Sequence, residues 1–428
     1  MKKVLCSILA MMLVTLCAVS GLAADKPTVT IWHNQNGAVG EVFKAKLADF
    51  IAANPEFNWE IEDVTAGQDN MGTRISTALA ADELPDVFWY WGGFTIEKMA
   101  RAGKLANAQE YFDASEVIKA DQYSESALAY MTIDGVLYGV PRQGFYCSWL
   151  CNKEIFEKLN LEYPKTMQDV IAISAVLNEN GYIPLAMGSS GGNPAHYFVS
   201  DLFHQLEGGT EQVSNFGTTA QYKSDVSLKV AQQILDLRAA KVFPEDTVAN
   251  GDWTPAFELY NSEKAAMVYS NHNTLAGLSE EMFAKSVIID VPMMDGAVVD
   301  TSTFVQTSAN NGTIISERGW SDEAKKPGII KFMDWWNSDE VQQALANVGS
   351  LTTRITGITY PEGSIMNVMD SFYAGRPAVK SLYNATSYSD AWNVHQSACD
   401  LLFAGNLTAE EFVDMIQEAY DEAVADAE

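Results

Sequence analysis

The stretch TVTIWHNQNGAVGEVFKAKLADFIAANPEFNWEI, residues 28–61, decides the fold. Its first residues alternate as a strand does, with Val29 and Ile31 alternating with Thr28 and Thr30. Apolar residues then recur at helical spacing until Pro55 ends the helix, and strand alternation resumes at Trp59. A strand, a helix and a second strand in so short a stretch form a parallel pair joined by a crossover. That unit builds an α/β sheet.

The same logic recurs along the chain and predicts an α/β protein throughout. A mature chain of roughly 400 residues commonly divides into two lobes. No repeat array, low-complexity tract or flexible linker interrupts the sequence, so we expect short ordered crossings between the lobes. The further predicted elements are a helix capped at Thr166 and closed by Gly181, a strand at 183–187, and helices near 225–240, 329–336 and 409–424.

The N-terminus has the pattern of an export signal. Lys2 and Lys3 precede an apolar stretch that runs to Leu22, and the small residues Ala23 and Ala24 follow. We predict a signal peptide over residues 1–24 and export to the periplasm or the cell surface. A membrane anchor is the alternative, since the stretch is about long enough to span a bilayer. Its polar residues and the cleavable-looking site after it favour cleavage.

The cysteines and histidines suggest neither a disulfide scaffold nor a metal site. Cys147, Cys151 and Cys399 remain after cleavage, so one must stay unpaired within a chain. Cys147 and Cys151 lie about 13 Å apart on a predicted strand, too far to bridge. Cys17 follows a leucine where a lipid-attachment site needs a small residue, so we expect a freely diffusing form. The five histidines show no ligand spacing with cysteines, and we expect no metal and no cofactor.

The charge excludes one class of partner. The formal net charge is -29, and a surface this acidic repels nucleic acid and anionic membranes. Most of the acidity serves solubility, and it disfavours an anionic ligand without excluding one.

Motifs for catalysis are missing from the sequence. It holds no G-x-S-x-G turn, no zinc-protease histidine pair and no phosphate loop ending in Lys-Ser or Lys-Thr. The glycine-serine run at 188–192 lacks the spacing of a nucleophile turn, and we interpret it as a polar loop facing a ligand. An exported glycosidase stays open as an alternative, because two carboxylates suffice for that reaction and the chain has 56 Asp and Glu residues. We do not expect an enzyme.

Aromatic residues stand beside amides at the ends of predicted strands. Sugars need that combination, because the C–H faces of a pyranose pack on aromatic rings while its hydroxyls need donors and acceptors. A single tryptophan beside a strand more often belongs to the core, but open α/β sheets bind ligands at the carboxyl ends of their strands. Together the clusters predict a small ligand such as a sugar. They are residues 32–36 (WHNQN), 89–91 (WYW), 271–273 (NHN) and 392–393 (WN).

Several segments, in order, resemble the sugar-class solute-binding proteins of ATP-binding-cassette (ABC) importers, the group of the maltodextrin-binding protein. Each piece is short, but their order and spacing span nearly the whole mature chain. The pieces are residues 30–33 (TIWH), 79–88 (LAADELPDVF), Gly103 with Leu105, 134–141 (DGVLYGVP), 151–158 (CNKEIFEK), 164–166 (PKT), 264–267 (KAAM), 291–292 (VP) and 403–411 (FAGNLTAEE).

The resemblance implies a two-lobed fold of the type II periplasmic-binding-protein kind, with a ligand cleft between the lobes. It implies three hinge crossings, near Gly139-Val140, near Val291-Pro292 and around Ser350. Residues 25–139 with 293–350 would form the first lobe, and residues 140–292 with 351–428 the second. Ligand that touches both lobes would favour closure.

The resemblance also points to particular site residues. By position, Trp89 and Trp392 match sugar-stacking tryptophans, and 271–273 match a segment that supplies a further aromatic, which here would be His272 or Trp253. Where relatives carry an acidic residue after 140–141, this chain has Arg142 and Gln143, so a maltodextrin does not carry over as the ligand. The candidate ligand-binding residues are Trp32, His33, Asn34, Trp89, Trp91, Arg142, Gln143, Trp253, Asn271, His272 and Trp392.

The resulting functional expectation is a monomeric binding component that captures a mono- or oligosaccharide and hands it to the membrane permease of an ABC importer. A second hypothesis keeps the binding role but changes the ligand to a phosphorylated or amino-acid-like solute held by Arg142 or Arg74.

Overall fold

The opening stretch folds as its sequence predicts. The computed structural model describes residues 26–35, 37–64, 68–219 and 221–427, and the predicted signal peptide lies outside them. Strand β1 (Thr28–His33), helix α2 (Gly37–Ala53) and strand β2 (Asn58–Asp63) follow in order. The two strands pair in parallel, with Val29 opposite Trp59. The first crossover unit is therefore confirmed.

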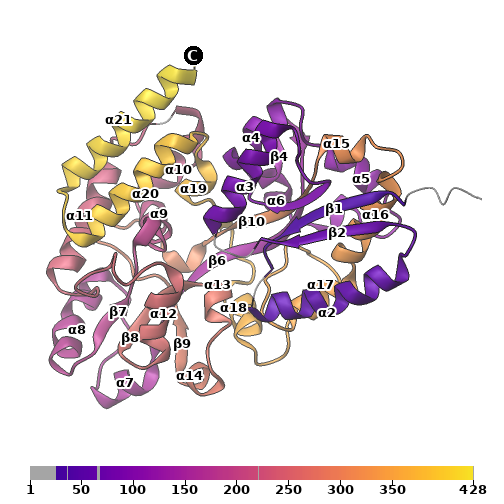
Figure 1. Ribbon diagram of the computed structural model, residues 1–428. Coiled ribbons are helices and arrows are strands. Elements are labelled where there is room, and N and C mark those ends of the chain that lie inside the picture. Colours follow the sequence, from indigo (N-terminus) through magenta and orange to yellow (C-terminus); the bar gives the residue numbers. More distant parts are fainter. Residues whose placement is uncertain (1–25, 36, 65–67, 220, 428) are drawn as a thin grey trace, which may run out of the picture.

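Two α/β lobes stand side by side, one drawn mainly in indigo and orange and the other in magenta and yellow (Figure 1). A single sheet path, β2-β1-β3-β10-β6-β8-β7, runs through both. The further elements of the first lobe are α3 (Gln68–Ala81), β3 (Val87–Tyr90), α4 (Phe94–Arg101), α5 (Ala108–Ala114), η1 (Ala120–Gln122), α6 (Glu125–Tyr130), β4 (Thr132–Ile133), β5 (Val136–Leu137), α15 (Glu317–Trp320), α16 (Lys326–Asn337) and α17 (Asp339–Ala346).

The second lobe holds the long helices of the C-terminal part. The helices predicted after Thr166, from Asp225 and after Thr408 are α8, α11 and α21. Its elements are α7 (Lys153–Lys158), α8 (Met167–Glu179), β7 (Ile183–Ala186), η2 (Ser190–Gly192), α9 (Ala195–Gln205), α10 (Gly209–Thr219), α11 (Asp225–Ala239), α12 (Trp253–Asn261), β8 (Ala265–Asn271), α13 (His272–Leu275), α14 (Glu280–Ala284), β9 (Ser286–Ile289), η3 (Thr301–Thr303), α18 (Ile365–Tyr373), β11 (Ala378–Val379), α19 (Leu382–Ala385), α20 (Ser389–Ala404) and α21 (Ala409–Ala427).

Two long strands, β6 (Val140–Asn152) and β10 (Val305–Ile315), join the lobes. β6 pairs with β10 along residues 140–146 and with β8 along residues 147–151, so it passes from the first lobe into the second. β10 starts beside β11 of the second lobe and ends beside β3 of the first. All thirteen residues of β6 are buried, Cys147 and Cys151 among them, and both thiols are free.

The second and third crossings differ in place from the sequence-based expectation. Met293 exchanges backbone hydrogen bonds with Lys165 and Met167 at 2.9 and 2.8 Å, which ties the chain after Val291-Pro292 to the second lobe. The chain returns to the first lobe only along β10. Residues beyond Ser350 also stay near the first lobe, since Ile355 N–H donates to the Gln122 carbonyl at 2.9 Å.

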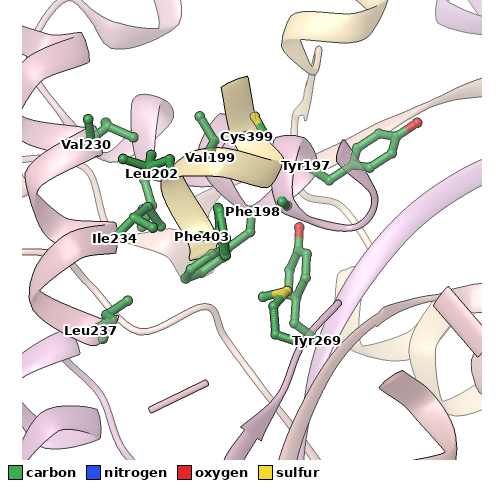
Figure 2. Close-up of a cluster of buried hydrophobic side chains, with 14 of the residues drawn as sticks. Tyr197, Phe198, Val199, Leu202, Val230, Ile234, Leu237, Tyr269, Cys399 and Phe403 are labelled. Carbon is green, nitrogen blue, oxygen red and sulfur yellow. The ribbon is translucent and has the colours of Figure 1, made fainter. Parts of the chain in front are cut away.

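The core of the second lobe forms around helix α9, in which every residue is buried. Figure 2 shows Leu202 of this helix beside Val230 and Ile234 of α11, and Phe198 beside Phe403 of α20 and Tyr269 of β8. The side chains of α11 in this cluster, Val230, Ile234 and Leu237, recur every three or four residues and are fully buried. A helix that is covered on all sides organises the core around itself.

Phe198→Ala is therefore expected to lower the free energy of unfolding by about 3–5 kcal/mol, the usual range for removing a buried ring and leaving a cavity. The control is Val117→Ala, where the wild-type side chain is 53% exposed and a change within about 0.5 kcal/mol is expected. Urea denaturation of both variants is the measurement. Equal effects would mean that α9 is not central to the core.

A buried carboxyl group connects this core to the crossing strand β10. Asp201 on α9 accepts hydrogen bonds from the Tyr269 hydroxyl at 2.6 Å and from the Gln306 Nε2 at 2.9 Å. Burial raises the pKa of Asp201 to about 7. The proton is thus held more tightly in the folded chain than in the unfolded one, where the pKa is about 3.9.

This raised pKa predicts a pH-dependent stability. The contribution of Asp201 is greatest at acid pH and falls by about 1.4 kcal/mol per pH unit as the pH rises from about 4 to about 7. The stability of Asp201→Asn relative to the wild type is therefore expected to increase over that range and to level off above it. Thermal unfolding at several pH values measures this, with the exposed Asp121→Asn as control. A difference independent of pH would contradict the argument.

Candidate ligand-binding site between the lobes

A cleft of two connected pockets lies between the lobes. The large pocket has a volume of about 1170 Å³ and the small pocket about 560 Å³. Trp91, Asp252 and Asn273 line both, so the pockets are continuous.

The first lobe contributes one face of α3 to the large pocket. Thr73, Ser76, Thr77 and Ala80 recur at helical spacing and are exposed in the cleft wall. Gly72 lies on the same face. These small side chains leave room beside the helix, and their hydroxyls can meet polar groups of a ligand.

Trp91 stands at the junction of the pockets, directly after strand β3. Its ring is half-buried and lies 4.9 Å from the Trp89 ring and 5.1 Å from the Tyr90 ring, centroid to centroid, in edge-on arrangements. These neighbours hold the Trp91 ring in place. Trp89 itself is only 7% exposed and lines the small pocket.

The second lobe presents an aromatic wall to the large pocket. Trp392 on α20 meets the rings of His196 and Tyr383 at 5.0 and 5.3 Å. Tyr197 packs 4.5 Å from Phe145 and 5.7 Å from Trp253. Burial lowers the pKa of His196 well below its usual value, so this ring is neutral at physiological pH. The wall is therefore uncharged.

Amide groups complete the large pocket. Asn271 caps α13, because its Oδ1 accepts the Thr274 N–H at 3.0 Å. Asn273 projects from the same helix, and its Oδ1 accepts the Gln143 Nε2 at 2.5 Å. The other amides of the pocket lining are Asn193, Asn393 and Gln396.

Arg142 and Gln143 lie at the small pocket, where β6 begins its passage between the lobes. The Arg142 guanidinium donates to the side-chain oxygens of Asn311, Gln35 and Gln143, each at 3.0 Å. Gln143 Oε1 also accepts the Asn311 Nδ2 at 3.0 Å. The network ties Gln35 at the end of β1 to both crossing strands, and through Gln143 to Asn273 of the second lobe.

The structure brings most of the predicted residues into the cleft lining. Trp91, Trp253, Asn271 and Trp392 line the large pocket, and Asn34, Trp89, Arg142 and Gln143 line the small one, with Trp91 in both.

Three predicted residues lie elsewhere among the described residues. Trp32 is covered by the guanidinium of Arg74 at 4.5 Å, and Arg74 forms a bidentate ion pair with Glu62. His33 is buried, which lowers its pKa to about 4. His272 is also buried, with a pKa near 3, and packs against Phe145 and Tyr146. The loop at 188–192 packs on α20 instead, where Gly191 and Gly192 N–H donate to Asp400.

Within the described parts of the chain, no three or more His, Cys, Asp or Glu side chains gather as a metal site would require. Nor does any helix there combine the length and apolar character needed to cross a membrane.

Sequence comparison identifies the family. Residues 34–343 match the family model of bacterial extracellular solute-binding proteins. The chain belongs to this family. The resemblance found in the sequence and the predicted two-lobed fold are thereby confirmed. The family consists of binding proteins and is extracellular.

Relatives in sequence are about a quarter identical to this solute-binding protein over the parts that match. An uncharacterized ABC transporter extracellular-binding protein of Pyrococcus horikoshii is 24% identical over 273 residues, which are 59% of this chain and 61% of the relative. An osmoprotective compounds-binding protein of Synechocystis is 27% identical over 208 residues, 48% of each chain. The matched parts thus span about half to three fifths of these relatives' own length.

Solved structures of similar fold cover the chain more completely. A chitin oligosaccharide binding protein has a TM-score of 0.80 at 20% identity, over 94% of this chain and 100% of that one. A maltose-bound protein of T. maritima has a TM-score of 0.73 at 17% identity, over 92% of this chain and 99% of that one. At sequence identities this low, the structural similarity shows that the chain has the same fold as these proteins.

Several cleft residues of this solute-binding protein went unrecognised in the sequence. The face of α3 at 73, 76, 77 and 80 carries a helical-period stripe of small, mostly hydroxyl-bearing residues, which is a readable signal. His196 and Tyr197 follow Asn193 closely and repeat the aromatic-amide pattern used elsewhere. Tyr383 also stands directly before an amide, Asn384, and the packing of α19 against α9 brings it to the cleft.

Proposed function

We propose that the protein captures a carbohydrate in the cleft and delivers it to the membrane permease of an ABC importer, without chemical conversion. The observation that carries the proposal is the composition of the large pocket. Aromatic rings, amides and hydroxyls line it, and Asp252 is the one carboxylate among its described lining residues. Rings stack on the C–H faces of a sugar while neutral polar groups match its hydroxyls.

The same lining argues against the glycosidase alternative. Hydrolysis of a glycosidic bond needs two carboxyl groups, about 5–5.5 Å or 6.5–9.5 Å apart. Among the described residues that line either pocket, Asp252 alone carries a carboxylate. A sugar bound here would meet no acid and base pair, which supports capture without turnover.

Lobe closure supplies a signal that a permease can recognise. A ligand that touches α3 of the first lobe and α20 of the second gains contacts that the separated lobes cannot offer, so binding shifts the population toward closure. The relative named as an ABC transporter extracellular-binding protein supports delivery to a permease. We further propose that the exported chain acts as a monomer.

A thermal-shift panel of neutral and acidic mono- and oligosaccharides tests the function. A sugar at a hundred times its dissociation constant is expected to stabilise the fold by about 2.7 kcal/mol. Chromogenic glycosides in the same panel are expected to release no product. If no sugar raises the melting temperature, the carbohydrate proposal fails, and release of product would favour the glycosidase.

Export requires its own test. We propose cleavage of residues 1–24, so intact-mass analysis of the secreted protein is expected to find a start near Ala24 or Asp25. A mature chain that begins at a lipidated Cys17 would contradict both the cleavage site and the free form.

A further inference from the structure

Arg142 is a buried cation without an anionic partner. Its side chain is 5% exposed, and its three hydrogen bonds all end on neutral amide oxygens. Among the described residues no carboxylate lies within ion-pair distance of its guanidinium, although Arg354, equally buried, pairs with Asp339 at 2.6 Å. Removing a cation from water without a counter-charge is costly. Consistent with this, burial lowers the pKa of Arg142 to about 9.

A second buried donor lines the same pocket. The Trp89 side chain is 7% exposed, and its Nε1 has no hydrogen-bond acceptor among the described residues. Trp89 and Arg142 both line the small pocket. An indole N–H and a guanidinium can only donate hydrogen bonds. A group that complements them both must be rich in acceptors and negatively charged.

The number of charges favours a carboxylate over a phosphate. A guanidinium carries five N–H donors, of which three are engaged here, and its planar fork matches a planar carboxylate. Arg142 is the one Lys or Arg side chain among the described residues that line either pocket, and Asp252 is the one Asp or Glu side chain there. A carboxylate adds one negative charge to this pair, whereas a phosphate approaches two negative charges at neutral pH and is disfavoured more strongly.

From this geometry we infer that the small pocket is a subsite for the carboxylate of an acidic sugar, held by Arg142 and the Trp89 indole N–H. The inference rests on the proposed carbohydrate function. Because Trp91, Asp252 and Asn273 line both pockets, the rest of the ligand would continue into the large pocket, whose aromatic rings and amides are neutral and where Asp252 is the one carboxylate among the described lining residues. The ligand class is a uronic acid or an oligosaccharide that ends in one.

Calorimetric titration with matched pairs of sugars tests the inference. The probes are glucuronate against glucose, galacturonate against galactose, and trigalacturonate. The wild type is expected to bind at least one uronate about tenfold or more tightly than its neutral parent. A ratio of affinities of this size is what one charge-assisted hydrogen bond typically contributes. Arg142→Met is expected to abolish that preference, and Arg142→Lys to restore part of it, since Lys keeps the charge but loses the fork. Lys331→Met, which removes an exposed cation outside both pockets, is expected to keep it.

Trp89→Phe keeps the test decisive if Arg142→Met fails to fold. This variant removes the N–H but retains an aromatic ring, and it is expected to reduce the preference for the uronate about threefold or more. A neutral parent bound as tightly as its uronate overturns the inference, as does an unchanged preference in both variants. Arg142-dependent binding of glucose 6-phosphate without binding of uronates also overturns it. If no sugar of either kind binds, the proposed function itself fails.

Discussion

Trp91→Ala is expected to weaken carbohydrate binding about 30-fold or more, the effect of losing at least 2 kcal/mol at an aromatic anchor. The Trp91 ring lies where the two pockets meet, so a sugar that extends through the cleft must pass it. Contacts with Trp89 and Tyr90 already fix the ring, so little conformational entropy is lost when a ligand stacks on it. Titration calorimetry of the variant with the best sugar of the panel measures the loss.

The control for Trp91 is another half-buried tryptophan of the first lobe. Trp335 on α16 packs on Phe50 at 4.8 Å and lines neither pocket. Trp335→Ala is expected to lower the melting temperature without changing the affinity for the sugar. If both variants weaken binding equally, the effect of Trp91 is a general loss of structure rather than a lost contact.

Gly72→Phe is expected to reduce binding on the order of 100-fold by filling the large pocket, since steric overlap typically costs ~1–3 kcal/mol. Gly72 lies inside α3 and lines this pocket, and the nearest atom to a Cβ added there is the Tyr90 hydroxyl oxygen at 3.8 Å. The protein can therefore accept a Cβ at this position without a clash. The added phenyl ring is expected to occupy space in the large pocket that the ligand needs.

Gly72→Ala is the matched variant for this prediction. Alanine is favoured over glycine inside a helix by up to about 1 kcal/mol, so this variant is expected to melt at a slightly higher temperature and still bind sugar. Thermal melts and titrations of both variants are the measurements. A Gly72→Phe protein that binds as the wild type does would place the ligand outside the large pocket.

The parts of the fold that were predictable have local signals. The β1-α2-β2 unit follows from a change of period, from two to helical and back, and α8 and α21 begin at capping residues. Thr166 illustrates this, because its Oγ1 accepts the Asp169 N–H at 3.1 Å as the capping pattern predicts. Such signals depend only on neighbours in sequence.

Strand β10 was not predictable in that way. Its sequence, VQTSANNGTII, has few apolar residues and no alternation. Gln306 and Asn311 are nevertheless buried, because Asp201, Arg142 and Gln143 satisfy their side chains from other elements. Partners so distant in sequence are invisible before the chain folds. The second crossing between the lobes therefore lies along β10 and not at Val291-Pro292, where the resemblance implies it.

The candidate site likewise combines residues that the sequence indicates with positions that only the folded chain defines. Aromatic residues at a strand end pointed to Trp89 and Trp91, but sequence alone could not rank them. The structure buries Trp89 and leaves Trp91 at the junction of the pockets. Trp32, which had the same local pattern, lies beneath Arg74 because Glu62 on the neighbouring strand β2 holds that guanidinium.

A crystal structure grown with the sugar that stabilises the protein most tests whether the cleft binds a carbohydrate. We expect one sugar molecule between the lobes, with the Trp91 ring against it on the first lobe and Trp392 near it on the second. We also expect α3 and α20 to lie closer together than without ligand. A sugar bound outside the two pockets, or in contact with only one lobe, would contradict binding between the lobes.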